Sequence, residues 1–203
     1  LPGKQIGVML PSIGSVGILL LATYLADKIP VMMNRTHPET AFAHCVKFSQ
    51  TKKILTSKAF FDKINIPWLK NYEFVFLEDL LKAIPLHRKL KALIKSRYFP
   101  LPKKLDPTAV VLYTSGSESL PKAVPLTHEN LVSNLIGAVE IMHIQQDERF
   151  FCYLPPFHSF GFTVNTVFPL VAGLRSVSTP DPNDSLTVAN LIAHTKPTLL
   201  ATT

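Results

Sequence analysis

Short apolar runs alternate with amphipathic segments along almost the whole chain, and this alternation most restricts the fold. Apolar runs of four or five residues predict β-strands, and segments with apolar residues three and four apart predict helices. Alternating strands and helices require crossover connections, so we expect an α/β fold: a largely parallel sheet with helices on both faces. The expected strands are residues 6–10, 30–33, 53–56, 74–77, 109–113, 150–154, 174–178 and 198–201, and the expected helices are residues 16–25, 38–49, 80–98, 129–142, 161–171 and 186–194.

The size and composition are those of a globular chain with one sizeable core. The 203 residues are 47% apolar and only 17% charged, which excludes a disordered chain. Leu1 leads almost directly into an expected strand, and Thr203 follows another. Natural termini seldom lie there, so we expect a piece of a longer polypeptide.

Positive charge is concentrated in one part of the sequence. The net charge is +7, and the stretch from Lys47 to Lys104 holds fourteen Lys or Arg against four Asp or Glu. Such a band attracts phosphates, anionic lipid or nucleic acid, and salt screens the attraction. An ordinary solvated face is the alternative interpretation.

Neither the cysteines nor the first apolar run indicates a special environment. Cys45 and Cys152 lack the spacing of a disulfide framework or a zinc site, which favours a reducing cytosol and small buried side chains. Residues 6–26 are broken by Pro11 and Gly14, and the apolar stretch that remains is shorter than the roughly 20 residues of a membrane span. We expect a buried strand followed by a buried helix.

The stretch most informative about chemistry is residues 110–124, Val-Val-Leu-Tyr-Thr-Ser-Gly-Ser-Glu-Ser-Leu-Pro-Lys-Ala-Val. A buried strand runs into a hydroxyl-rich turn with one glycine and then a lysine, and a helix is expected to begin near Thr127. Such a turn can direct backbone N–H groups, hydroxyls and an ammonium at phosphate oxygens. It cannot be aligned with a Walker A loop. A plain polar turn is the alternative.

This stretch resembles the phosphate loop of the acyl-adenylate-forming superfamily, which includes acyl-CoA synthetases, luciferases and adenylation domains of peptide synthetases. The Ser117–Glu118 pair is closer to the branch of acyl-[acyl carrier protein] synthetases fused to 2-acylglycerophosphoethanolamine acyltransferases. The residues that match the general loop are Tyr113, Thr114, Ser115, Gly116, Pro121, Lys122 and Val124.

A second block, residues 154–163 (Leu-Pro-Pro-Phe-His-Ser-Phe-Gly-Phe-Thr), resembles the next motif of the superfamily. Residues 7–11 and 29–31, with Asn34, follow its amino-terminal subdomain. The resemblance implies that residues 1–203 are part of the large N-terminal adenylation domain, truncated at both ends. Residues 1–105 would be the first βα portion, and residues 106–203 the portion with the phosphate loop and the acyl pocket.

The resemblance implies a ligase that activates a fatty acid with ATP and Mg²⁺ as acyl-AMP. A thiol of acyl carrier protein or coenzyme A then accepts the acyl group, which could feed lysophospholipid acylation. The superfamily's remaining motifs would follow Thr203, so residues 1–203 alone are not expected to turn over. By position, Thr114 would hold Mg²⁺, and His158 would lie between acyl tail and nucleotide; a structural histidine that caps the next helix is the alternative for His158. The β- and γ-phosphates would contact Ser115, Gly116, Ser117 and Lys122.

Three residues depart from the superfamily's loop and leave other interpretations open. Ser119 and Ala123 replace glycines, which often serve a backbone with positive φ, and Glu118 puts a carboxylate near a polyanionic nucleotide. An activator of amino or aryl acids, and a non-catalytic nucleotide-binding or membrane-docking module, are the alternatives. The histidines other than His158 show no partner pattern and are expected at the surface or in packing.

The segment from Pro85 to Phe99 combines an apolar stripe with basic residues. Arg97 and His87 interrupt the stripe, and Pro100 follows the segment. The stripe consists of Leu86, Leu90, Leu93, Ile94 and Tyr98. A basic amphipathic helix can lie on an anionic membrane surface, and a helix packed on the sheet with its lysines in water is the alternative. We expect a cytoplasmic protein, peripheral on the inner face of a membrane if the helix binds lipid, and no nucleic-acid partner.

Overall fold

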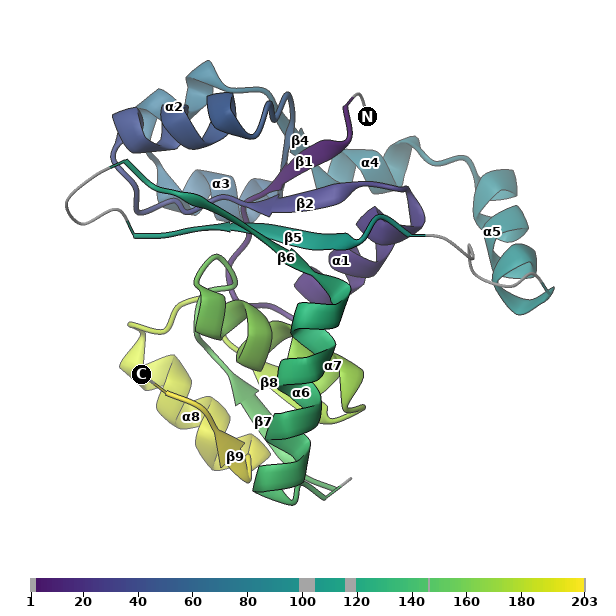
Figure 1. Ribbon diagram of the computed structural model, residues 1–203, viewed down its shortest axis with the longest axis vertical. Helices are drawn as coiled ribbons and strands as arrows, with labels where there is room; N and C mark the ends of the chain where they lie inside the picture. Colours follow the sequence, from purple (N-terminus) through teal and green to yellow (C-terminus); the bar gives the residue numbers. More distant parts are fainter. Residues whose placement is uncertain (1–2, 99–104, 116–119, 146, 203) are drawn as a thin grey trace.

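The computed structural model describes residues 3–98, 105–115, 120–145 and 147–202, and its strands form two sheets (Figure 1). The six-stranded sheet has the order β4-β3-β1-β2-β5-β6. Its first five strands pair in parallel, and β6 runs antiparallel to β5 at the edge. The strand bounds are Gln5–Val8 (β1), Ile29–Met32 (β2), Ile54–Thr56 (β3), Phe74–Phe76 (β4), Thr108–Tyr113 (β5) and Ala123–Thr127 (β6).

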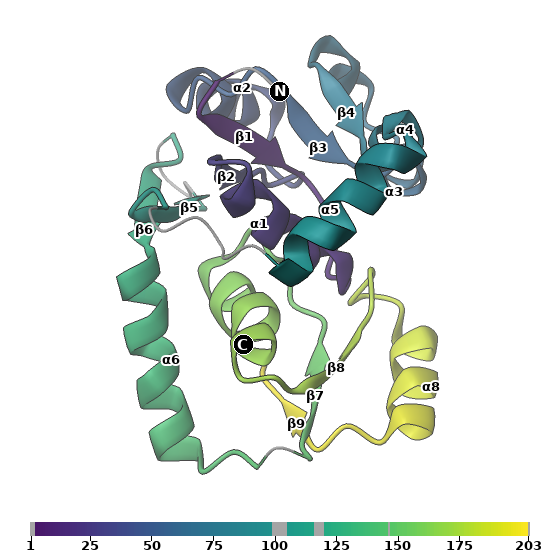
Figure 2. The same ribbon diagram turned by 90° about the vertical axis from the view of Figure 1, so that its right-hand side faces the viewer.

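The second sheet has three parallel strands in the order β8-β7-β9. They are β7 (Arg149–Cys152), β8 (Arg175–Ser178) and β9 (Leu199–Leu200). Helix α6 (His128–Met142) runs from the end of β6 in the first sheet toward β7 in the second (Figure 2). The described chain is therefore α/β, with a largely parallel central sheet, as predicted.

Helices cover both faces of the first sheet. On one face lie α2 (Glu39–Phe48), α3 (Lys58–Ile64) and the 3₁₀ helix η1 (Pro67–Asn71), and on the other lies α1 (Ser15–Leu25). The remaining helices are α4 (Leu77–Ala83), α5 (Leu86–Tyr98), the π-helical turn η2 (Gly161–Val167), α7 (Phe168–Val171) and α8 (Ser185–Thr195).

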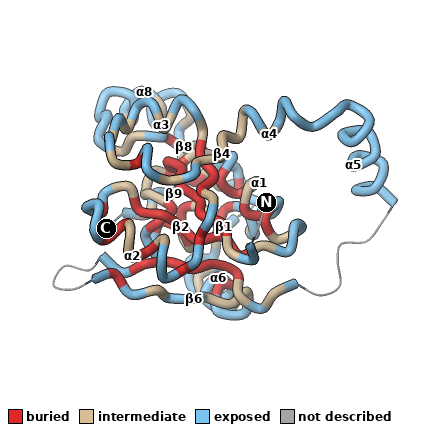
Figure 3. The backbone as a smooth tube through the Cα atoms, turned by 90° about the horizontal axis from the view of Figure 1, so that it is seen from above, coloured by how far each residue is buried: buried red, intermediate tan, exposed pale blue. Residues whose placement is uncertain are grey.

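Alternate residues of the central strands face two different apolar clusters. In β5, Val110 and Leu112 contribute to the cluster beneath α1, whereas Val111 and Tyr113 contribute to the cluster beneath α2 and α3. Successive side chains of a strand point to opposite faces, so a strand covered on both sides needs an unbroken apolar run. Buried residues accordingly concentrate in the strands (Figure 3).

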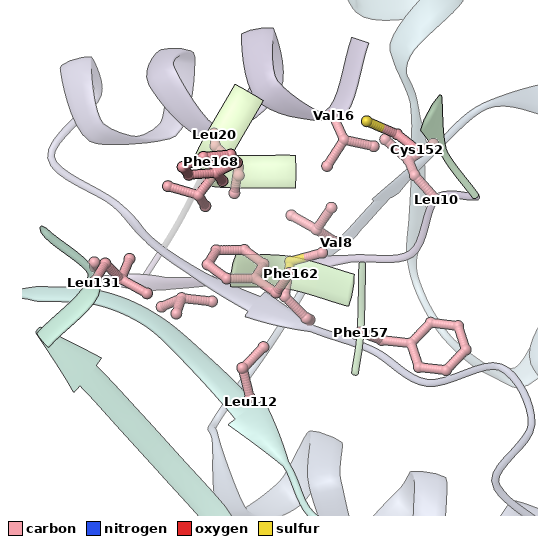
Figure 4. Close-up of a cluster of buried hydrophobic side chains, with 14 of the residues drawn as sticks. Val8, Leu10, Val16, Leu20, Leu112, Leu131, Cys152, Phe157, Phe162 and Phe168 are labelled. Carbon is pink, nitrogen blue, oxygen red and sulfur yellow. The ribbon is translucent and has the colours of Figure 1, made fainter. Parts of the chain in front are cut away.

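The cluster beneath α1 is shared by the two sheets (Figure 4). Val8 and Leu112 from the first sheet pack in the same cluster as Phe150 and Cys152 of β7 and Phe162 of η2. Phe162 is wholly buried. This shared cluster joins the two sheets into one core.

The structure corrects four expectations about the elements. The helix expected over residues 80–98 is two helices, α4 and α5, because Pro85 lacks the N–H that a continuous helix needs. Strand β6 was not predicted; it contains Pro125, which an edge strand tolerates. Helix α3 was also not predicted. The helix expected over residues 161–171 begins as the π-helical turn η2.

Both cysteines are buried, as expected, and residues 6–26 form the expected strand and helix, but the helix α1 is buried on one side only, with Ile18 and Leu25 exposed. Cys45 in α2 and Cys152 in β7 are free and buried, and burial raises the pKa of each thiol to about 12. Residues 6–26 form β1 and α1. Across the described ranges, no helix is long and apolar enough to cross a bilayer.

Helix α6 begins at the predicted place, with a reciprocal cap. The Thr127 hydroxyl accepts from the Asn130 N–H at 3.0 Å, and the Asn130 side chain accepts from the Thr127 N–H at 3.0 Å. We expect Thr127→Ala to lower the free energy of unfolding by about 1 kcal/mol, because the Asn130 N–H loses the hydroxyl that accepts its hydrogen bond. Urea unfolding measures the change. Ser133→Ala, an exposed hydroxyl one turn later, is the control and should change stability by less than about 0.5 kcal/mol.

Candidate active site

The predicted phosphate loop lies at one edge of the first sheet, and the turn with His158 follows β7 of the second sheet. Because β1, β2, β3 and β5 are parallel, their carboxyl ends share that edge. The segments that follow these strands include Met33 to Pro38 after β2 and Thr114 after β5. In open α/β sheets, ligands bind outside the carboxyl ends of the strands.

The predicted phosphate loop leaves β5 and returns as β6, and Thr114 and Lys122 close its base. The Thr114 N–H donates to the Lys122 carbonyl at 3.1 Å, and the Lys122 N–H donates to the Thr114 hydroxyl at 3.0 Å. Tyr113 and Ala123 are register partners just inside this closure. We call these two hydrogen bonds the hairpin neck. It fixes where the loop begins and ends.

The site residues that the structure describes at the neck are exposed. Thr114, Ser115 and Lys122 all face solvent, and within the described ranges no carboxylate lies in ion-pair distance of the Lys122 ammonium. Two hydroxyls and one ammonium are therefore accessible to an anion. The other two predicted phosphate contacts, Gly116 and Ser117, lie outside the described residues.

Buried contacts hold the end of β5 that leads into the loop. The Tyr113 hydroxyl donates to the Cys45 carbonyl of α2 at 2.8 Å, and burial raises the pKa of Tyr113. A buried, bonded tyrosine immediately before Thr114 fixes the position from which the loop starts. This explains why a bulky aromatic residue precedes the hydroxyl-rich turn.

One of the three departures from the superfamily's loop causes no backbone strain. Ala123 lies in β6 and is not among the described residues with positive φ. An alanine is therefore accommodated there without the cost of a left-handed conformation. Glu118 and Ser119 lie outside the described residues.

The second motif forms a tight turn after β7. The His158 N–H donates to the Pro155 carbonyl at 3.2 Å, and the Phe162 N–H donates to the His158 carbonyl at 2.7 Å. Asn165 accepts at its side-chain oxygen from the N–H groups of Tyr153 and Leu154, which ties η2 to the end of β7. The turn is thus fixed at both of its ends.

His158 itself is exposed, and its neighbour Phe157 is buried. The two rings pack with centroids 4.6 Å apart, and partial burial lowers the pKa of His158. In the described part of the chain, the His158 ring makes no side-chain hydrogen bond, so the alternative of a helix-capping histidine gains no support. Phe157 fixes the turn in the core and leaves the imidazole at the surface.

His37 is a residue that sequence reasoning missed. It is 7% exposed, and its Nε2 has no hydrogen-bond partner among the described residues. Burial, and then the charge of His158, lower the pKa of His37, and its Nδ1 lies 3.9 Å from the Cys45 sulfur. Asn34 shapes the turn by accepting from the Thr36 N–H and hydroxyl at 2.9 and 2.7 Å. The position of His37 just after an expected strand was the one available signal.

An apolar cavity adjoins the His158 turn. Its volume is about 710 Å³, and Ser159 and Phe160, the residues after His158, are in its wall. Helices α6 and α7, η2 and β9 supply most of the remaining wall, including Leu135, Ala138, Val164, Phe168 and Leu199. In the described ranges, no group of three His, Cys, Asp or Glu side chains is arranged to hold a metal ion.

These features define an open α/β domain with a candidate anion site and an apolar cavity on one framework. Over residues 1–203 the chain matches the family described as AMP-binding enzyme. It therefore belongs to the AMP-binding enzyme family, the acyl-adenylate-forming superfamily that the two motifs predicted.

Known proteins similar to the chain include ligases of several substrates. The long-chain-fatty-acid–CoA ligase of Bacillus subtilis is 26% identical over 97% of this chain and 40% of its own length. The 4-coumarate–CoA ligase 1 of Petroselinum crispum is 26% identical over 86% of this chain and 32% of its own length. The structure of o-succinylbenzoate coenzyme A synthetase from Bacillus subtilis, in complex with ATP and magnesium ion, shares the fold with a TM-score of 0.74, at 18% identity over 98% of this chain and 50% of that one. The chain spans half or less of each of these proteins.

The His158 turn depends on a glycine that no larger residue can replace without movement. A Cβ on Gly161 would overlap the carbonyl oxygen of Pro155. We expect Gly161→Ala to lower the free energy of unfolding by roughly 1–3 kcal/mol, because the backbone of the turn must shift. Gly137→Ala in α6 is the matched control, since a Cβ there has nothing within 4 Å. It should stabilise by up to about 1 kcal/mol in urea unfolding; equal effects of the two changes would contradict the packing described here.

The buried histidine predicts a loss of stability in acid. The pKa of His37 is lowered in the folded chain, so the unfolded chain binds protons first as pH falls through its ordinary value of 6.5. Stability is therefore expected to be full above that value and to decrease as the pH falls below about 6.5. Urea unfolding across this range tests the expectation. His37→Gln, which cannot titrate, should show a smaller decrease than the unsubstituted chain; identical pH profiles would contradict it.

Proposed function

We propose that this chain supplies the phosphate loop and part of the acyl pocket of an enzyme that converts a fatty acid to acyl-AMP and transfers the acyl group to a thiol. The proposal rests on one observation: the segments that hold the two motifs are both attached to the same apolar core. The hairpin neck at Thr114 and Lys122 follows β5, and the His158 turn, beside the apolar cavity, follows β7.

The nucleotide in this proposal is ATP with Mg²⁺. The o-succinylbenzoate coenzyme A synthetase that shares this fold was solved with both. Ser115, Gly116, Ser117 and Lys122 are assigned to the β- and γ-phosphates, and Thr114 to the metal. The exposed hydroxyls and ammonium fit this role, and the Thr114 oxygen, which accepts one hydrogen bond from Lys122, keeps a second lone pair for a cation. Few protein ligands are expected, since Mg²⁺ usually retains waters and binds substrate phosphates.

The chemistry needs activation because a carboxylate is a poor acylating agent. A carboxylate oxygen attacks the α-phosphorus of ATP, the bond to the β-phosphate oxygen breaks, and pyrophosphate leaves. A thiol of acyl carrier protein or coenzyme A then attacks the acyl carbon, and AMP leaves. The contribution of these residues is to position the triphosphate and to neutralise charge on the departing pyrophosphate.

The acyl side of the proposal rests on the apolar cavity. A chain of CH₂ groups leaves water favourably in such a space, at about 0.8 kcal/mol for each buried CH₂. His158 precedes the cavity wall and is assigned to the junction of acyl tail and nucleotide. The similarity to a long-chain-fatty-acid–CoA ligase supports a fatty acid. Similarity to 4-coumarate–CoA ligase 1 favours an aryl acid as the second candidate.

Two finer parts of the proposal come from the Ser117–Glu118 pair: membership in the acyl-[acyl carrier protein] synthetase branch, and delivery of acyl groups to lysophospholipid. A cytoplasmic location is proposed from the two free cysteines, and a peripheral contact with a membrane from the basic amphipathic residues 85–99. We also propose that residues 1–105 and 106–203 are two portions of one N-terminal adenylation domain. Strands β5 and β6 of the second portion complete the sheet of the first.

ATP–pyrophosphate exchange on the full-length protein that contains this chain tests the function. Exchange that depends on fatty acids supports the proposal, exchange with 4-coumarate or amino acids alone assigns another substrate class, and no exchange with any of them refutes adenylation. Lys122→Ala should reduce exchange roughly ten- to hundredfold, because a hydrogen bond to a charged group is worth about 1.5–3 kcal/mol. Lys52→Ala, another exposed lysine, is the matched control and should leave the rate unchanged.

A further inference from the structure

Helix α5 is the one part of the described chain that stands away from the core along its whole length. Every residue from 81 to 98 is exposed, and α5 has no buried residue (Figure 3). The helix projects from the body beyond Pro85 (Figure 1). The alternative of a helix packed on the sheet is therefore wrong for α5.

An isolated helix of this size has no obvious source of stability. Helices shorter than about 12–15 residues are marginal in water, and in proteins they are stabilised mainly by burying one face. Helix α5 has 13 residues and buries none of them. A surface that covers one face would supply the missing stabilisation.

The face available for such a surface is an apolar stripe that Arg97 and His87 interrupt. Leu86, Leu90, Leu93, Ile94 and Tyr98 lie on one side of the helix at spacings of three, four and eight residues. They are between 52% and 74% exposed. Single exposed apolar residues are ordinary, but five in one stripe indicate an interaction site.

The charged side chains of α5 indicate what kind of surface it can bind. Five of the 13 residues are basic and none is acidic, so the helix carries a charge of +5: Arg88, Lys89, Lys91, Lys95 and Arg97. Lysines on both sides of an apolar stripe can bury their stems and keep their ammonium groups at a polar boundary. An anionic bilayer surface is complementary to both features, whereas a nucleic acid would leave the apolar stripe in water.

We propose that α5 binds an anionic phospholipid bilayer, with its axis parallel to the surface and its leucines in the headgroup–acyl boundary. At 1.5 Å per residue the helix is about 20 Å long, too short to span a hydrocarbon core of about 30 Å. The proposal deepens the peripheral membrane contact of the proposed function. Its failure would leave the adenylation proposal untouched, because the two are measured separately.

Flotation of the 203-residue chain with lipid vesicles tests the proposal. The chain should float with vesicles of phosphatidylcholine and phosphatidylglycerol and not with phosphatidylcholine alone, and added salt should release it. Lys91→Gln with Lys95→Gln should weaken the binding roughly 30-fold, since each lysine near an anionic surface contributes about 1 kcal/mol. Leu90→Ser with Ile94→Ser, which keeps all five charges, should weaken it at least tenfold.

Matched controls separate α5 from the rest of the basic surface. Lys47→Gln with Lys52→Gln removes two exposed lysines elsewhere, and Leu186→Ser removes an exposed leucine of α8; neither should reduce flotation. Circular dichroism shows that each variant is folded. No flotation with the anionic vesicles, or a loss as large in the control variants, overturns the proposal. A last outcome would also overturn the proposal: the chain binds duplex DNA but not vesicles, and the double variant Leu90→Ser with Ile94→Ser still binds the DNA. The basic residues of α5 would then serve a nucleic acid.

Discussion

The shared apolar cluster between the two sheets is the interaction on which the rest of this structure depends. It places Leu112, two residues before Thr114, in the same packed core as Phe157, the residue before His158. The two motifs are separated by an antiparallel strand, a helix and another strand, yet both begin from this core. Close-packed interiors deform little, so groups mounted on one core keep a fixed relation to each other. The predicted phosphate loop and the His158 turn therefore keep a fixed position relative to each other.

The elements that the sequence predicted best were the strands that are buried on both faces of the sheet. Strands such as β1, β2 and β5 appear as unbroken apolar runs because neither side of the sheet meets solvent. The elements that sequence reasoning missed or merged carry weaker signals. Strand β6 is half-exposed and contains Pro125, so it looks like the continuation of a loop. The periodicity of α4 continues into α5, and only Pro85 marks the break between them.

The candidate site shows a similar limit. Thr114, Ser115, Lys122 and His158 could be named because they lie in contiguous motifs. His37 could not, because its significance comes from being buried and from lacking a partner at Nε2 among the described residues, and these are properties of tertiary structure. The cavity beside His158 was equally hidden, since its wall combines α6, η2 and β9 from distant parts of the sequence.

The hairpin neck has a consequence for how such a loop can diversify. Backbone and hydroxyl bonds between Thr114 and Lys122, together with the pairing of β5 and β6, define the two ends of the loop independently of the residues between them. Changes in the composition or length of the loop should therefore leave the register between β5 and β6 unchanged. Natural selection, or a protein engineer, could exchange that segment between relatives while the surrounding domain still folds.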